Sequence, residues 1–217
     1  MLNRFSCLFF AGLFFYACKN ETDNKYRQSI AASRMQINAT FFDPTQTPLD
    51  SITFSHFKGI KFFPINAAYK VKAKLEPIKD TTIFELLHSH NASKPYRNYA
   101  LATFELNGKT FSLRVLEAAI HKAGYENYLL IPFMDETNSE ETYGGGRYID
   151  IEKPISGESD KQQIEIDFNL AYNPYCAYNN SYTCPIPPKE NNLATRIEAG
   201  MKYDALEFEE IHLSGKH

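Results

Sequence analysis

The feature that most constrains the fold is a hairpin signature in the middle of the chain. Residues 100–106 and 109–115 flank Asn107-Gly108, and Phe111, Leu113 and Val115 alternate with polar side chains. Both central residues of a type I′ turn need positive φ, which asparagine and glycine adopt at low cost. Because a period of two is typical of a strand with one buried face, we predict an antiparallel hairpin.

Other segments predict further strands around this hairpin. Residues 70–75 alternate three lysines with three apolar side chains, which indicates a strand with one face in water. Residues 128–133 are almost all apolar, which indicates a central strand covered on both faces. Shorter strands are expected at 57–63, 82–87, 148–151 and 163–168, with Gly157 in the turn between the last two. About eight strands without helices between them predict a mainly β fold, an antiparallel barrel or sandwich.

Helical spacing of apolar residues is confined to the N-terminal part. Residues 24–42 predict an α-helix that packs on the sheet and ends before Pro44. Residues 194–202 predict either a short helix or a last strand. Since no linker composition occurs between residues 30 and 210, we expect residues 26–217 to form a single β-rich domain.

The first residues have the character of an export signal. Arg4 precedes a largely apolar run over residues 5–17, which is too short to span a bilayer as a helix. Its end, Tyr16-Ala17-Cys18, resembles the lipobox of bacterial lipoproteins, although Phe15 replaces the usual leucine. The resemblance implies removal of residues 1–17 and a lipid on Cys18; an ordinary secretory signal or an uncleaved anchor are the alternatives.

Residues 18–25 are polar and predict a short tether, loosely similar to the surface-export signal of Bacteroidota lipoproteins. We therefore expect a lipid-anchored protein of the bacterial cell envelope, at the outer membrane, the cell surface or the periplasmic face. The net charge is −3 and no polybasic run occurs, so nucleic acid is not an expected partner.

Two long motifs carry a resemblance to a known family. Residues 167–178 read DFNLAYNPYCAY, followed by CPIPPKENNL at 184–193 and IEAG at 197–200, and residues 132–148 read PFMDETNSEETYGGGRY. These motifs, with a looser match near residues 47–59, resemble the bacterial and archaeal domain-of-unknown-function family 1684 over roughly residues 30–203. The resemblance implies a common fold and a set of candidate residues, but no activity.

The first candidate site is the loop that ends at Arg147. Gly144, Gly145 and Gly146 allow the backbone to expose its N–H groups, so the loop could hold an anion that Arg147 would grip. Alternatively, Asp135 or Glu141 pairs with Arg147 and locks the loop. No Lys-Ser/Thr follows the glycines, which excludes a nucleotide P-loop.

The second candidate site is the polar end of the strand at 163–168. Asp167 and Asn169 share one strand face, and Tyr172 and Asn173 follow, a set suited to polar recognition or acid–base work. Alternatively, these side chains only pin the strand to its loop. If strands 148–151 and 163–168 pair as neighbours, one rim pocket is expected, lined by Glu141, Tyr143, Arg147, Asp167, Asn169 and Tyr172.

Cys176 and Cys184 are eight residues apart, and a disulfide is the default expectation for an exported chain. Such a bridge would contribute roughly 2–3 kcal/mol. Their spacing does not fit a zinc site, and a catalytic thiol would need a nearby base. His88 and His90 could form a metal pair, but their neighbours indicate a surface turn, so no metal or cofactor is expected.

These observations leave three classes of function. The first is a binding module for a small anionic or carbohydrate-like ligand. The second is a hydrolase- or transferase-like enzyme in which Asp167, Glu141 or Glu190 acts as acid or base and Arg147 holds charge. The third is a structural envelope protein without a ligand. Clustering of polar residues in two loops favours a site, and the lack of a nucleophile or metal motif puts binding first.

Overall fold

The computed structural model describes residues 8–154, 163–204 and 208, with side chains described from Glu21 onward. It is a mainly β fold with an N-terminal α-helix, as the sequence predicts. The helices are α1 (Leu8–Phe42) and α2 (Ser51–His56). The strands are β1 (Lys70–Pro77), β2 (Phe84–Leu87), β3 (Ser93–Leu106), β4 (Lys109–Ala118), β5 (Tyr128–Asp135), β6 (Arg147–Glu152), β7 (Gln163–Asp167) and β8 (Asn192–Leu193).

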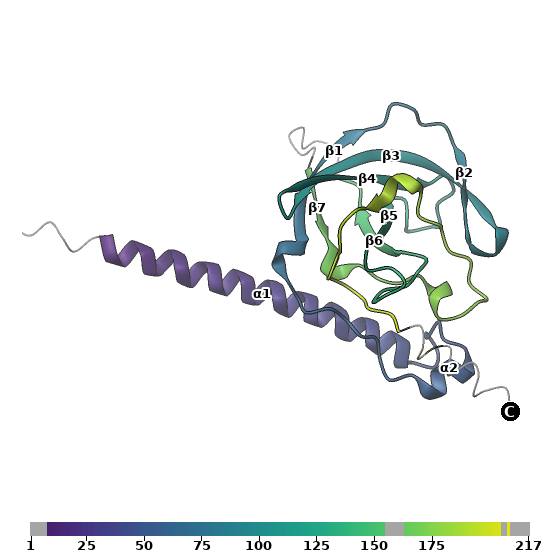
Figure 1. The fold of residues 1–217 in the computed structure, drawn as a ribbon, viewed down its shortest axis with the longest axis horizontal. Coiled ribbons are helices and arrows are strands. Elements are labelled where there is room, and N and C mark those ends of the chain that lie inside the picture. Colours follow the sequence, from purple (N-terminus) through teal and green to yellow (C-terminus); the bar gives the residue numbers. More distant parts are fainter. Residues whose placement is uncertain (1–7, 155–162, 205–207, 209–217) are drawn as a thin grey trace, which may run out of the picture.

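The strands form one eight-stranded sheet that curls into a half-barrel (Figure 1). Its order is β6-β5-β4-β3-β1-β7, while β2 pairs with β3 and β8 pairs with β5. All pairings are antiparallel except that of β8, which runs parallel to β5. The Asn107-Gly108 hairpin is confirmed: φ is 52° at Asn107 and 73° at Gly108, and Leu106 faces Lys109 across the turn.

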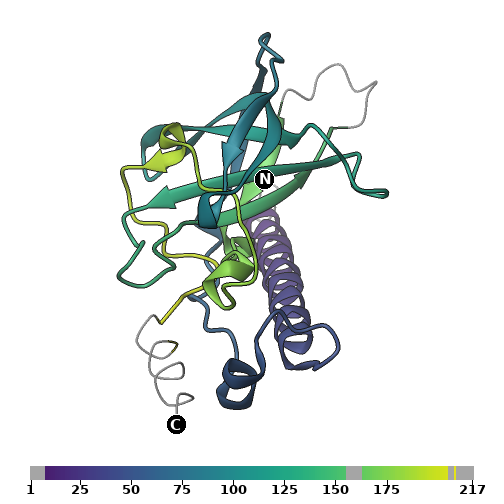
Figure 2. The same cartoon turned by 90° about the vertical axis from the view of Figure 1, so that its right-hand side faces the viewer.

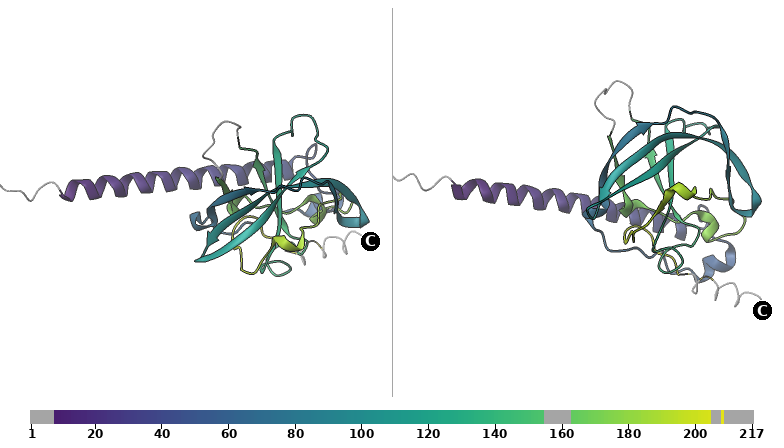
Figure 3. Two further views of the ribbon diagram at one scale, coloured as in Figure 1. Left: turned by 90° about the horizontal axis from the view of Figure 1, so that it is seen from above. Right: turned by 45° about the horizontal axis from the view of Figure 1, so that its top comes forward.

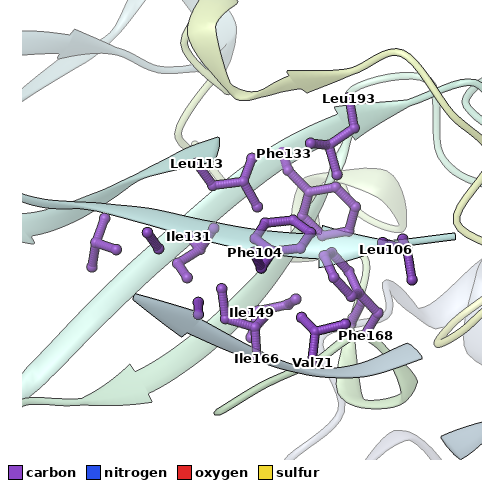
Figure 4. Packing of buried hydrophobic residues seen from close by; sticks show 14 of the residues in the cluster. Val71, Phe104, Leu106, Leu113, Ile131, Phe133, Ile149, Ile166, Phe168 and Leu193 are labelled. Atoms are coloured by element: carbon purple, nitrogen blue, oxygen red, sulfur yellow. The ribbon is translucent and has the colours of Figure 1, made fainter. Parts of the chain in front are cut away.

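The main core lies inside the half-barrel (Figure 4). On β1 the alternation predicts the burial: Val71, Ala73 and Leu75 face the core, and the lysines between them face solvent. Phe168 packs edge-on against Phe133, with ring centroids 5.4 Å apart. Burial of such large rings supplies most of the driving force for folding.

Helix α1 lies along one side of the half-barrel, and its N-terminal part extends beyond the sheet (Figures 1 and 3). Figure 2 shows the helix beside the sheet rather than within it. Ile30 and Phe41 are its buried contacts with the body. The predicted end at residue 42 is confirmed, and the helix also includes residues 18–25, the segment predicted as a tether.

The N-terminal signal is only partly covered by the structure. Residues 1–7 of the predicted signal peptide and the side chain of Cys18 lie outside what the structure describes. Among the residues that are described, no helix is both long and apolar enough to cross a bilayer.

Three predictions from the sequence differ from the structure: two elements and one strand pairing. Residues 57–63 form no strand but a single bridge between Phe62 and Met201, and residues 194–202 are neither helix nor strand. Gly157 lies outside the described residues. Most important, β6 and β7 do not pair: β6 pairs with β5 and β7 with β1, at opposite ends of the sheet order. Backbone hydrogen bonds of 2.9 and 3.0 Å instead join Tyr148 of β6 to Tyr172.

Candidate functional site

Arg147 does not line a pocket. Its side chain and that of Asp135 are both 0% exposed, and Nη2 donates to Asp135 Oδ2 at 2.8 Å. The guanidinium also donates to the carbonyl oxygens of Ile197, Ala199 and Met201. Burial lowers the pKa of Arg147, and the Asp135 carboxylate opposes this shift. The expected anion grip is therefore wrong, and the alternative, a clamp between Arg147 and Asp135, is what the structure contains.

Gly146, the last of the three glycines before Arg147, is needed for close packing of the loop on its neighbours. Gly146 has φ of +90°, and a Cβ there would lie 2.6 Å from the carbonyl oxygen of Phe133 and 2.8 Å from Pro187 Cγ. Since neither neighbour can be displaced cheaply, only glycine allows the loop to approach β5 so closely. Gly144 and Gly145 are exposed. With Arg147 turned into the interior, the loop offers no cation for an anion.

Asp167 and Asn169 hold α1 to the end of β7. The Tyr26 hydroxyl of α1 donates to both carboxylate oxygens of Asp167, at 3.0 and 2.9 Å. The Asn169 amide N–H donates to Asp167 Oδ1 at 3.0 Å, and Asn169 also exchanges side-chain to backbone bonds with Asn66. Both residues are buried. Asp167 and Asn169 therefore belong to a structural hydrogen-bond network and do not line a ligand pocket, as the alternative prediction held.

The other residues of the predicted rim pocket are dispersed. Glu141 accepts hydrogen bonds from Lys202 at 3.0 Å and from Arg196. Tyr143 stacks edge-on against Tyr203 with ring centroids 5.3 Å apart. Glu190, which was considered as an acid or base outside that pocket, is exposed and accepts a hydrogen bond from Arg114 at 3.3 Å. The predicted pocket is therefore not formed: β6 and β7 do not pair, and each of these side chains has partners of its own.

A cavity of about 500 Å³ lies elsewhere, between the C-terminal part of α1, β6 and residues 172–184, which we call the tyrosine-rich loop. Its aromatic lining consists of Phe41, Tyr148, Tyr172, Tyr175 and Tyr182. Its polar lining consists of Thr40, Asp150, Asn173 and Thr183. Ile37, Pro174, Cys184 and Met201 complete the wall. Concave, mostly apolar sites with a few polar groups are typical of small-ligand sites.

Asp150 is the only charged residue among the described residues that line this cavity. It follows Tyr148 by two positions on β6, so both side chains are on the strand face opposite the core residue Ile149. The hydroxyls of Tyr128 and Tyr172 both donate to Asp150 Oδ1, each at 2.7 Å. Within the described part of the chain, no group donates to Oδ2 in the structure. One carboxylate oxygen is thus held in place and the other is available.

The surroundings of Asp150 differ from those of an ordinary surface carboxylate. Asp150 is exposed to solvent, and it lies among the aromatic residues that line the cavity. Partial desolvation by neighbouring protein atoms raises the pKa of Asp150, and the two tyrosine hydrogen bonds oppose the shift. Nearby, Asn173 donates to Tyr178 Oη at 2.8 Å and to the Lys202 carbonyl at 3.0 Å, while its buried Oδ1 has no donor within the structure as described.

Sequence reasoning found part of this cavity. Tyr172 and Asn173, both predicted site residues, line it. Asp150 was missed, although one signal pointed to it: Asp150 alternates with core-facing residues on a predicted strand and shares its face with Tyr148. The contribution of α1 could not be found, because no local pattern shows where a helix docks.

The predicted disulfide is not formed: Cys176 and Cys184 are both buried free thiols. They are held by hydrogen bonds instead, since the Cys176 amide N–H donates to Cys184 Sγ at 3.3 Å. A side-chain hydrogen bond from Cys184 lowers the pKa of the Cys176 thiol, and further ones from Ser89 and Tyr143 add to this. The pair thus stabilises the wall of the cavity, to which Cys184 belongs.

The histidines that the structure describes form no cluster. His88 is buried and its Nδ1 bonds to the carbonyl oxygen of Leu86 at 2.9 Å, while His90 sits in the following turn with φ of 59°. His212 and His217 lie outside the described residues. In the part that is described, no three histidine, cysteine or acidic side chains converge as metal ligands would.

Comparison with known proteins gives a family but no activity. A search of curated proteins found no match. A solution NMR structure of an uncharacterised protein from Haloarcula marismortui is similar, with a TM-score of 0.65 and 30% sequence identity over 85% of this chain and 98% of that one. Residues 55–202 match the model described as protein of unknown function (DUF1684). The chain therefore belongs to the DUF1684 family.

Proposed function

We propose that this protein is a binding module that holds a small polar ligand in the tyrosine-lined cavity. The observation that carries the proposal is Asp150, which lines a cavity of about 500 Å³: its Oδ1 is fixed by two tyrosine hydroxyls, while its Oδ2 has no donor among the described residues. A fixed acceptor beside aromatic rings is what recognition of a ligand with hydrogen-bond donors requires.

The ligand class follows from the charges around the cavity. The anionic ligand considered from the sequence depended on Arg147, which is buried against Asp135. The lining has a carboxylate and no cation among its described residues. An anion would be repelled by Asp150, so the ligand is neutral or positively charged. The carboxylates considered for an enzyme, Glu141, Asp167 and Glu190, lie outside the cavity, so nothing in the site favours that alternative.

Filling the cavity tests the proposal. Thr40 lines it from α1, and a Thr40→Trp side chain would occupy space that a ligand needs. A panel of sugars, polyols, amines and carboxylates can be screened by ligand-observed NMR, with affinities measured by calorimetry. We expect Thr40→Trp to weaken every hit at least ~10-fold, which corresponds to 1.4 kcal/mol.

Gln36→Trp is the matched control, because Gln36 is exposed on the same helix and does not line the cavity. It should leave affinity unchanged. If no compound of the panel binds the wild-type protein, or if Thr40→Trp binds as well as Gln36→Trp does, the cavity is not a binding site.

We also propose that a lipid on Cys18 tethers the module to the cell envelope, on the strength of the short apolar run ending in Tyr16-Ala17-Cys18. The full-length Cys18→Ala variant should leave the membrane fraction and lose detergent partitioning. Cys176→Ala is the control, since it removes a thiol that the lipid does not use. Cys18→Ala protein that stays in the membrane fraction after an alkaline wash would contradict the tether.

A further inference from the structure

Resting on the proposed function, we infer that the ligand of this cavity is a small organic ammonium ion that carries N–H donors. Three properties of the wall agree on this class: its charge, an unused acceptor and its aromatic side chains.

The first property is an unbalanced charge. Asp150 has no cationic partner; its described partners are the neutral hydroxyls of Tyr128 and Tyr172. Asp150 is exposed to solvent and lines the cavity, and no described residue of the lining carries a positive charge. A cationic ligand would therefore be attracted to this carboxylate.

The second property is an acceptor without a donor. Asp150 Oδ2 receives no hydrogen bond from any described residue. An ammonium group with N–H bonds can donate to this oxygen, whereas a quaternary ammonium cannot.

The third property is the aromatic wall. Tyr148 and Tyr172 meet edge to face with ring centroids 5.8 Å apart, and Tyr175 and Tyr182 meet the same way at 5.3 Å. Faces and edges of several rings therefore border one small space. Ring faces attract cations, and this attraction grows where water is excluded. A carboxylate beside several rings suits an ammonium ion better than a neutral sugar.

Four probes that share a phenyl ring separate these properties. Benzylamine is a cation with N–H donors, benzyltrimethylammonium a cation without them, benzyl alcohol neutral and benzoate an anion. Calorimetry on the wild-type protein should give the tightest binding for benzylamine, at least ~10-fold tighter than benzyl alcohol. Benzyltrimethylammonium should bind more weakly than benzylamine, and benzoate should not bind.

Asp150→Asn provides the decisive variant, because an asparagine Oδ1 can still accept from Tyr128 and Tyr172. The preference for benzylamine over benzyl alcohol should disappear, because the affinity for the cation falls much more than the affinity for the neutral alcohol. Glu105→Gln, at a position outside the cavity, is the control and should keep the preference. Thermal melting establishes that each variant is folded.

The outcomes distinguish the two proposals. If benzyl alcohol and benzylamine bind equally to the wild-type protein, the ammonium inference fails and the binding module stands. A preference that persists in Asp150→Asn also overturns the inference, since Asp150 would not be its source. If none of the four probes binds at millimolar concentration and the wider panel has no hit, both proposals fail.

Discussion

Replacing Arg147 by alanine is expected to lower the free energy of unfolding by roughly 3–5 kcal/mol, because it leaves the buried Asp135 carboxylate without its partner. Three carbonyl oxygens, of Ile197, Ala199 and Met201, lose their donor at the same time. The segment at 194–202 has no regular structure, and these bonds hold it together with backbone hydrogen bonds to Phe63 and Ala171. Urea denaturation followed by circular dichroism measures the loss.

Arg196→Ala is the matched control for this prediction. Arg196 also has carboxylate partners, Glu140, Glu141 and Glu198, but these pairs are open to solvent. Exposed ion pairs contribute little, so the control should be far milder. If Arg147→Ala is as stable as Arg196→Ala, the buried clamp is wrong. A variant that stays fully stable but loses ligand binding would restore Arg147 to the binding site.

The strands of this fold are predictable because their signals are local. Alternation at residues 70–75 and the Asn107-Gly108 turn determine which face is buried and how one hairpin is paired, and both predictions are confirmed. Segment 57–63 shows the limit: it has strand-like residues, yet it finds only one bridging partner, at Met201. Strand propensity is realised only where a neighbour offers a complete edge.

The candidate site was harder to predict because it depends on which strands pair. Adjacent strands usually pair, and this rule placed Arg147 and Asp167 on one rim. Here β6 pairs with β5 and β7 pairs with β1, at opposite ends of the sheet order. Arg147 is therefore paired with Asp135, and Asp167 accepts hydrogen bonds from Tyr26. A motif shows that residues matter together without showing whether they bind each other or a ligand.

The Ile197-Glu-Ala-Gly200 motif contains the second position with a large expected effect. Gly200 has φ of +77°, and a Cβ there would lie 2.5 Å from the carbonyl oxygen of Ala171 and 2.7 Å from that of Phe168. Both obstacles are backbone atoms of the turn before the tyrosine-rich loop. A Gly200→Ala variant must therefore move this turn as well as adopt an unfavourable φ. We expect a loss of more than ~3 kcal/mol in the free energy of unfolding, again by urea denaturation.

Gly124→Ala separates the effect of the unfavourable φ from the effect of the steric clash. Gly124 has φ of +85°, but a Cβ there would have nothing within 4 Å. This control therefore measures the backbone strain alone, about 1 kcal/mol. The excess loss in Gly200→Ala is the cost of separating residues 197–201 from the turn at 168–171. That turn leads directly into Tyr172 and Asn173, so surviving Gly200→Ala protein should also bind benzylamine more weakly than the Gly124→Ala protein. Equal stability of the two variants would mean that this close backbone approach does not hold the cavity wall.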